Sequence, residues 1–449
     1  MDSGPVFGDD EYTRRQSVLL SQLSTDSILL IPTNPMKIRS NDVYYPYRPS
    51  SDILYLSGWE EPCSLFCALY DDDRWVTSLF VRERDELAER WEGKRVGTIN
   101  AQAHWPVDKA FPWSTRIEQL EQEIKQRKTI FLQQGLDDEL DACVARILGY
   151  KDRKRSVTGI GPDSISDPSN LLAEMRMRKS DAEVEIMKKA ANVAVQAHIR
   201  AMKQTLGDTS EQMIQAEIEH EFTRNLAEPS YGSIVAGGDN ATILHYHKND
   251  EEITEGSLVL IDAGCEVDGY ASDITRTWPV NGKFSKAQRE IYELVLAAQT
   301  QAILECKVGN HWLDPHKAAM STISMGLIEL GILNCTYEEA MGKNLDGMSR
   351  KYFMHGTSHS LGLDVHDVGV TRPDGVGDGR ILESGMILTV EPGLYFPSWV
   401  DVKEVNDTYT GIGVRIEDDV LITDAGPVVL TDKAPKSVED LERIIGTGV

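Results

Sequence analysis

The chain has 449 residues, 41% hydrophobic and 26% charged, which is enough for two or three domains and at least one large core. Its formal net charge of −26, without any block of basic residues, argues against nucleic acid and anionic membrane surfaces as partners. The six cysteines suggest no disulfide framework, the first residues show no signal peptide, and no apolar run reaches the roughly 18 residues of a membrane helix, so we expect a reduced, cytoplasmic protein.

The first part of the chain alternates short apolar runs with helical patterns. Strands are predicted at Ser27–Ile31, Leu65–Tyr70, Trp75–Val81 and Thr129–Gln133. Helices are predicted at Glu118–Gln126 and Leu136–Leu148. This alternation is typical of an α/β domain, which we expect to occupy residues 1–170. The segment Ser156–Asn170 is rich in Ser, Gly, Pro and Asp and is therefore predicted to contain the boundary of this domain.

Residues 171–449 are expected to form a second domain that begins with a capped helix. Ser180 and Glu183 have the spacing of a capping box ahead of apolar residues at helical intervals. Further helices are predicted over Ser210–Asn225 and Ser285–Cys306. Strand and turn patterns cluster between the helices and in the final third, without a regular βαβ alternation. We therefore predict an α+β domain with largely antiparallel strands.

Two segments of this second domain resemble each other, and each contains an acid. Leu260–Gly264 and Thr389–Gly393 both have an acid, a small residue and a glycine after a strand-like pair, and each is followed by a second acid in a strand. The acids are Asp262 and Asp273 in the first half, and Glu391 and Glu417 in the second. A carboxylate in an apolar run is costly to bury without a positive partner, and four converging carboxylates repel one another. The pattern therefore predicts cations between them.

Histidines stand near the acids in the sequence. His355, His359 and His366 lie in MHGTSHSLGLDVHDVG, and His245 lies in ILHYHKND. Carboxylate oxygens with an imidazole suit divalent ions such as Mn²⁺, with Co²⁺, Zn²⁺ and Fe²⁺ as alternatives. No cysteine cluster supports a structural zinc site. Two such ions bridged by carboxylates form an arrangement that generates a nucleophile near neutral pH.

The ordered segments IDAG, SDITRTW, MHGTSHSLGLDVHDVG, LTVEPGLY and GVRIEDDVLIT resemble the dinuclear metallopeptidases of the pita-bread fold. Within these, the chain most closely resembles the aminopeptidase P family, the Xaa-Pro aminopeptidases, and Tyr44–Pro62 and Glu89–Gly97 resemble that family's amino-terminal domain. The resemblance implies metal ligands at Asp262 (bidentate), Asp273 (bridging), His359, Glu391 and Glu417 (bridging).

The same resemblance implies roles for side chains that do not bind metal. His245, His355 and His366 match histidines that line the substrate cleft and assist proton transfer or the transition-state charge. Arg415 stands two residues before the bridging glutamate, on the same face of a strand, and matches an arginine that orients the ligands. Tyr231 is expected to play a similar supporting part.

The implied activity is release of the first residue from peptides that have proline second. A hydroxide bridging two metal ions would attack the scissile carbonyl, and Glu391 would accept the proton. A prolidase, which cleaves only Xaa-Pro dipeptides, would use the same ligands and stays open as an alternative. A catalytically silent relative that uses the fold for binding is disfavoured, because all the ligand types are present.

The family tends to form dimers or tetramers, so the resemblance implies a homodimer or homotetramer, with Trp91 as a candidate contact. His247 is not expected at the site, since nothing but its position after His245 singles it out. Arg372–Arg380 is expected to be a flexible turn, because it lacks the full pattern of a calcium loop or a P-loop. The remaining histidines are expected on helices or loops: His104, His198, His220, His311 and His316.

Overall fold

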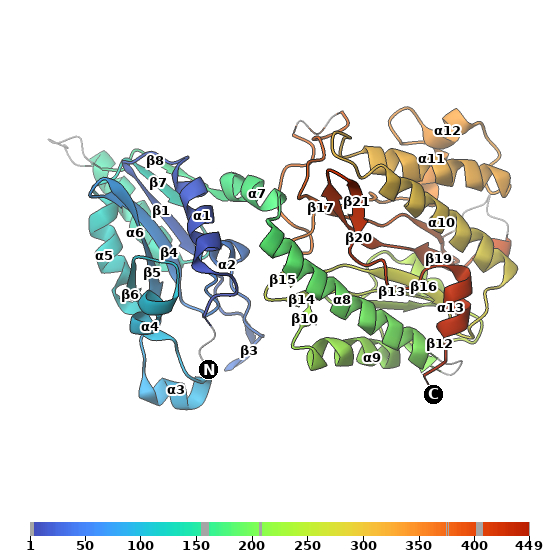
Figure 1. Ribbon diagram of the computed structural model, residues 1–449, viewed down its shortest axis with the longest axis horizontal. Coiled ribbons are helices and arrows are strands. Elements are labelled where there is room, and N and C mark those ends of the chain that lie inside the picture. Colours follow the sequence, from blue (N-terminus) through green and yellow to red (C-terminus); the bar gives the residue numbers. More distant parts are fainter. Residues whose placement is uncertain are drawn as a thin grey trace. The chain divides into compact units, whose positions relative to one another are not determined.

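The chain forms two compact units, Met1–Met175 and Arg176–Val449, coloured along the sequence from blue to red in Figure 1. The computed structural model describes residues 4–153, 161–205, 209–373, 375, 377–400 and 407–448. Among these residues, no helix has the length and apolar character needed to cross a membrane. The six cysteines all lie in the described ranges and all are free.

The first unit is built on a mixed six-stranded sheet. Its strands, in spatial order, are β6 (Lys109–Pro112), β5 (Arg74–Val81), β4 (Leu65–Asp71), β1 (Ser27–Pro32), β7 (Thr129–Leu132) and β8 (Ser164–Ser166). Strand β4 runs antiparallel to both β1 and β5, whereas the β5–β6, β1–β7 and β7–β8 pairs are parallel. Every residue of β1 is buried, as expected for a central strand covered on both faces. A separate two-stranded ribbon pairs β2 (Ile38–Ser40) with β3 (Val43–Tyr44).

The first unit also contains helices. They are α1 (Asp9–Leu20), α2 (Ser51–Ser57), α3 (Glu86–Glu92), α4 (Gly97–His104), α5 (Arg116–Ile124) and α6 (Asp138–Arg153). Apolar side chains of α5 and α6, among them Leu120, Ile124 and Val144, share one core cluster with Ile28 and Ile130 of the sheet. Burial of this apolar surface is the main source of stability for the unit.

The second unit contains further helices. They are α8 (Asp181–Gln204), α9 (Glu211–Arg224), α10 (Lys286–Leu304), α11 (Asp314–Glu329), α12 (Tyr337–Met341) and α13 (Val438–Ile444), and α7 (Ser169–Met177) spans the boundary between the units in the sequence. The capping box of Ser180 with Glu183 is present at the start of α8, and Ser285 with Gln288 caps α10 in the same way. These side chains satisfy backbone N–H groups that would otherwise lack partners.

The strands of the second unit pair antiparallel throughout the part of the chain that the structure describes. Three-stranded sheets are formed by β11 (Ile234–Gly237), β13 (Leu258–Asp262) and β16 (Thr275–Pro279); by β10 (Glu228–Pro229), β14 (Cys265–Val267) and β15 (Tyr270–Ala271); and by β17 (Ile387–Val390), β20 (Asp418–Thr423) and β21 (Gly426–Val429). Two-stranded sheets join β9 (Thr209–Ser210) to β12 (Glu252–Ile253), and β18 (Gly393–Phe396) to β19 (Ile412–Arg415). Helices and strands share one large core that includes Trp278 and Tyr292.

The predicted strands of the first unit are confirmed as β1, β4, β5 and β7, and the predicted helices as α5, α6, α8, α9 and α10. Within the predicted boundary segment Ser156–Asn170, Ser164–Ser166 pairs with β7 as an edge strand. Residues 156–160 of that segment lie outside the described residues, as do Asp374 and Val376 of the expected turn Arg372–Arg380.

Helix α1 was not predicted, because it buries polar side chains where an apolar stripe would be expected. Arg15 and Gln16 are among its buried residues. Gln16 donates to the carbonyls of Leu56 and Pro106, and Arg15 donates to the carbonyl of Tyr55. These hydrogen bonds satisfy the buried polar groups, so tertiary structure stabilises a helix whose local pattern is weak.

Candidate metal centre

The first two acids come from one antiparallel sheet. Asp262 ends β13, where it pairs with Thr275 of β16, and Asp273 stands just before β16. The Tyr231 hydroxyl lies 2.5 Å from Asp262 Oδ1 and also hydrogen-bonds to Asp273 Oδ1. The segment that follows Asp262 requires glycine, since a Cβ on Gly264 would lie 1.8 Å from the backbone oxygen of Ser272. The close approach of Gly264 to Ser272 and the shared Tyr231 hydroxyl hold the two carboxylates side by side.

The second two acids come from the other half of the unit. Glu391 follows β17, and its N–H donates to the carbonyl of Thr357 at 2.9 Å. Glu417 lies between β19 and β20, and its N–H donates to the carbonyl of Thr275 at 3.0 Å. The Thr275 hydroxyl in turn donates to Glu417 Oε2 at 2.7 Å. The two halves therefore meet through direct hydrogen bonds at the acids themselves.

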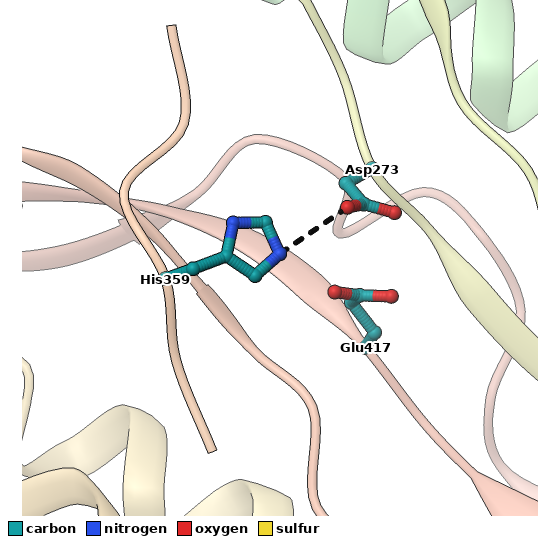
Figure 2. A group of neighbouring side chains, drawn as sticks. All are labelled: Asp273, His359 and Glu417. Atoms are coloured by element: carbon teal, nitrogen blue, oxygen red, sulfur yellow. Dashed lines mark ion pairs between the residues drawn. The ribbon is translucent and has the colours of Figure 1, made fainter. Parts of the chain in front are cut away.

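His359 points its imidazole at these carboxylates, as Figure 2 shows with Asp273 and Glu417. One ligand atom from each of the three residues lies within 4.8 Å of the others. The Nε2 atom is 3.4 Å from Asp273 Oδ2 and 3.8 Å from Glu391 Oε1, while Nδ1 is 3.0 Å from the Ser360 carbonyl. Burial opposes protonation of the ring, but Asp273 and Glu391 raise the pKa of His359 to about 9. The ring thus presents Nε2 to the acids.

The carboxylates are buried close together, and this raises their pKa values. Burial raises the pKa of Glu391 to about 7. Burial and then the charge of Asp273 raise the pKa of Glu417 well above its ordinary value, and burial raises that of Asp262 although Arg415 opposes the shift. Neighbouring divalent cations would favour the ionised forms. This donor chemistry fits a metal centre.

Arg415 connects the acids to a neighbouring histidine. Its guanidinium donates to Asp262 Oδ2 at 2.6 Å, to the Thr275 hydroxyl at 3.1 Å and to the Tyr395 hydroxyl at 3.1 Å. Tyr395 Oη lies 2.8 Å from His355 Nε2. Burial, with the nearby charge of Arg415, lowers the pKa of His355 to about 3, so this imidazole is neutral near pH 7.

All the candidate site residues face one cavity of about 400 Å³ in the second unit. They are His245, Asp262, Asp273, His355, His359, His366, Glu391, Arg415 and Glu417, together with Tyr231. The ring of His366 lies edge-on to that of His359, with centroids 4.4 Å apart. Apolar side chains of Ile234, Leu244 and Val365 complete much of the remaining wall. The structure thus brings the predicted residues together, while their individual roles stay predictions.

Sequence reasoning missed other residues at this site. His247, which was set aside, lines the cavity and stacks against His245 with ring centroids 6.2 Å apart. Thr275 and Tyr395 bond directly to site residues, and Asp419 Oδ2 accepts from the backbone N–H of Asp273 at 3.2 Å. Each missed residue stands two or four positions from a predicted one. The two-residue period of extended chain would have pointed to them.

Comparison with known proteins identifies the class of protein to which the chain belongs. Residues 185–424 match the profile of Metallopeptidase family M24, and residues 12–131 match that of the Aminopeptidase P, N-terminal domain. The chain is 41% identical over 438 residues to the Xaa-Pro aminopeptidase of Escherichia coli K12, covering 97% of each chain. It is 33% identical to the human Xaa-Pro aminopeptidase 3, covering 98% of this chain and 86% of that protein.

Solved structures agree with these sequence matches. The Pseudomonas aeruginosa aminopeptidase PepP superposes with a TM-score of 0.91 at 40% identity, covering 98% of both chains. Aminopeptidase P from E. coli, solved with the inhibitor Pro-Leu, gives the same values. The chain therefore belongs to the aminopeptidase P family of the M24 metallopeptidases. The predicted two-part fold, with its pita-bread second domain, and the predicted class of enzyme are confirmed.

Proposed function

We propose that this chain is a metal-dependent aminopeptidase that releases the first residue of peptides with proline at position two. The observation that carries the proposal is the convergence of four carboxylates and an imidazole on one cavity, with further histidines on its wall. Relatives named Xaa-Pro aminopeptidase, aligned over nearly the whole chain, support the substrate class.

The donor set suits two divalent cations. We assign as ligands Asp262, Asp273, His359, Glu391 and Glu417. Oxygen-rich ligands with one imidazole favour Mn²⁺, with Co²⁺, Zn²⁺ and Fe²⁺ as alternatives; a zinc-substituted E. coli aminopeptidase P has been solved with product. When bound, such ions generate a nucleophile from water near neutral pH and polarise the scissile carbonyl.

Glu391 is the proposed proton carrier. Its Oε2 lies 3.8 Å from His355 Nδ1 at the cavity wall. It would take a proton from the attacking water as the oxygen bonds to the carbonyl carbon. It would then return the proton to the proline nitrogen as the carbon–nitrogen bond breaks.

The neighbouring basic residues position this chemistry. Arg415 holds Asp262 and the Tyr395 hydroxyl, and Tyr395 in turn orients His355. His245 and His366 line the same cavity, where their imidazoles would donate to the carbonyl oxygen as negative charge develops on it. We assign His245, His355, His366 and Arg415 to these roles.

Recognition of proline would rest on shape. Proline has no backbone N–H, so a site selective for it gains nothing from an acceptor for that group. The apolar side chains of Ile234, Leu244 and Val365 beside the imidazoles provide a surface for an aliphatic ring. The free amine of the substrate, being positive, would lie towards the carboxylates.

The alternative activity is that of a prolidase, restricted to Xaa-Pro dipeptides. We also propose a homodimer or homotetramer, since Leu87, Trp91 and Ile99 are 70%, 87% and 84% exposed in this single chain. A reducing, cytoplasmic location is consistent with the free cysteines in the described part of the chain.

The test is hydrolysis of a matched pair, an Xaa-Pro dipeptide and a tripeptide with proline second. Protein stripped with a chelator is assayed before and after addition of Mn²⁺, Co²⁺ or Zn²⁺. Metal-restored release of the first residue from the tripeptide is the expected result. Cleavage of the dipeptide alone would establish a prolidase, and no cleavage with any metal would make the fold a binding platform.

A further inference from the structure

We infer that a second cavity, adjoining the metal centre, binds the residues of a peptide substrate that follow the proline. This inference rests on the proposed function and deepens it. The cavity has a volume of about 520 Å³, lies within the second unit, and shares two wall residues, Gly356 and Ser358, with the cavity that holds the metal-ligand candidates. A substrate anchored at the acids would reach it by crossing this shared wall.

At Gly356 the shared wall has no side chain. This residue is exposed, and a Cβ placed on it would meet no atom within 4 Å. The neighbouring residue on one side, His355, lines the first cavity, and the neighbour on the other side, Thr357, lines the second. An extended peptide crossing at Gly356 would therefore have room on both sides.

Ser358 supplies an unused polar atom at the crossing. Its Oγ is buried and has no hydrogen-bond partner among the described residues, and Ser358 as a residue lines both cavities. A buried hydroxyl without a partner is costly, so such groups are normally paired in native proteins. A backbone amide or carbonyl of a peptide passing over the wall would satisfy it.

Burial and hydrogen bonds hold the shared wall in place at Thr357. Thr357 is 1% exposed, its hydroxyl lies 2.7 Å from His316 Nδ1, and its carbonyl accepts from the N–H of Glu391. Burial lowers the pKa of His316 to about 4, so this histidine is neutral near pH 7 and serves as a hydrogen-bond partner that holds Thr357 in place. A wall that is already ordered loses little conformational entropy when a peptide binds, and this favours binding.

The lining of the second cavity fits a peptide tail that ends in a carboxylate. Trp312, Leu313 and Leu345 form an apolar part suited to side-chain contact. The charged lining consists of Arg350, Arg372 and Asp346, a net positive set in a chain of net charge −26. Arg350 donates to the carbonyls of Phe353 and His355 and is thereby engaged. Arg372 is exposed and donates one hydrogen bond, to the carbonyl of Gly377 at 3.3 Å, so its remaining N–H groups can meet a carboxylate.

Peptides of increasing length provide the first test. Asn344 is an exposed residue of the cavity lining, and Asn344→Trp would fill the cavity, whereas Lys343→Trp places the same bulk on the exposed neighbour outside the lining. For Asn344→Trp we expect unchanged kcat/KM on an Ala-Pro dipeptide and about a tenfold loss on Ala-Pro-Ala-Ala, carried by KM. Lys343→Trp should leave both values unchanged.

Charge provides the second test. In Arg372→Glu, the preference for Ala-Pro-Ala-Ala with a free C-terminus over its C-terminal amide should fall about fivefold, since an exposed charge-assisted contact is worth roughly one kcal/mol. Lys343→Glu makes the same change in net charge away from the cavity and should keep the preference. The measured quantity is the ratio of kcat/KM values for the two peptides.

The outcomes separate the two proposals. If the wild-type protein with added metal cleaves none of these peptides, the proposed function itself fails. If it cleaves long and short peptides alike, and Asn344→Trp affects them equally or Arg372→Glu behaves like its control, the proposed function stands and the subsite is wrong.

Discussion

Thr275 donates its hydroxyl hydrogen to Glu417 Oε2 at 2.7 Å, and its carbonyl accepts the N–H of Glu417 at 3.0 Å. These hydrogen bonds join residues 142 positions apart in the sequence. They tie the sheet that carries the first acid pair to the segment that carries the second. The geometry of the metal centre therefore depends on docking of the two halves of the second unit.

Replacing Thr275 with valine keeps the volume and removes the hydroxyl. We expect metal affinity to fall by about 10–100-fold, because ligands that lose an orienting partner bind metal less well. The affinity is measured by titrating stripped protein with Mn²⁺ in a calorimeter. Thr300→Val, on the exposed face of α10, is the matched control. Equal affinity in the two variants would contradict an orienting role for Thr275.

Asp418 lies directly after Glu417 in the sequence and forms an ion pair with Arg276 at 2.7 Å, with both side chains fully buried. Burial opposes ionisation of Asp418, but Arg276 and Lys436 lower its pKa to about 2. Arg276→Met leaves this carboxylate short of its main partner, so we expect the free energy of unfolding to fall by about 3–5 kcal/mol. Urea denaturation measures the change.

The control for this prediction is Arg289→Met. Arg289 pairs with Glu293 on the surface, where the side chains are 47% and 51% exposed. Surface pairs contribute about 0–1 kcal/mol. If the free energy of unfolding fell by a similar amount in both variants, the buried Arg276–Asp418 pair would contribute no more to stability than a surface pair.

Asp367 gives the folded protein a dependence on pH. Burial would raise its pKa, but Lys179 at 3.0 Å and Arg176 at 2.6 Å lower it below the ordinary value. A carboxylate with a lowered folded-state pKa stabilises the fold above its unfolded pKa of about 3.9, and this contribution disappears as the pH falls through the folded value.

Asp367→Asn should therefore be less stable than the wild type by about 3 kcal/mol at pH 7, with a gap that narrows below about pH 4. Urea midpoints across this pH range measure the gap. Asp424→Asn, which changes an exposed carboxylate, should be as stable as the wild type at pH 7 and below pH 4. A constant gap down to pH 3 would refute the assigned pKa direction.

Metal removal should lower the stability of the second unit. A ligand that binds only the folded state at 100 times its Kd stabilises that state by about 2.7 kcal/mol. We expect added Mn²⁺ to raise the Tm of stripped wild-type protein and to raise that of Glu417→Gln much less. Glu439→Gln, at a side chain 74% exposed, should respond like the wild type. An equal shift in all three proteins would place the metal elsewhere.

Much of this protein could be predicted from its sequence. The strands of the first unit and the capped helices of the second depend on local patterns, and the structure keeps them. The acids and His359 could be predicted as a set, because residue types in a fixed order carry the family resemblance. Local patterns do not predict elements that depend on polar contacts between distant residues. Helix α1 is an example, because its Arg15 and Gln16 are buried through hydrogen bonds to residues 40 positions away.

Tertiary structure alone decided how the predicted residues act on one another. The link from Arg415 through Tyr395 to His355 joins separate strands and a loop, and no local spacing indicates which hydroxyl will lie between the guanidinium and the imidazole. The second cavity likewise exists only in the folded chain, because its wall combines the segment around Gly356 with residues from distant parts of the sequence. The sequence determined the family, the residue types of the candidate metal ligands and the order of the elements. Docking of distant strands determined the pKa values and the shape of the cleft, because burial and charge proximity are properties of the packed chain.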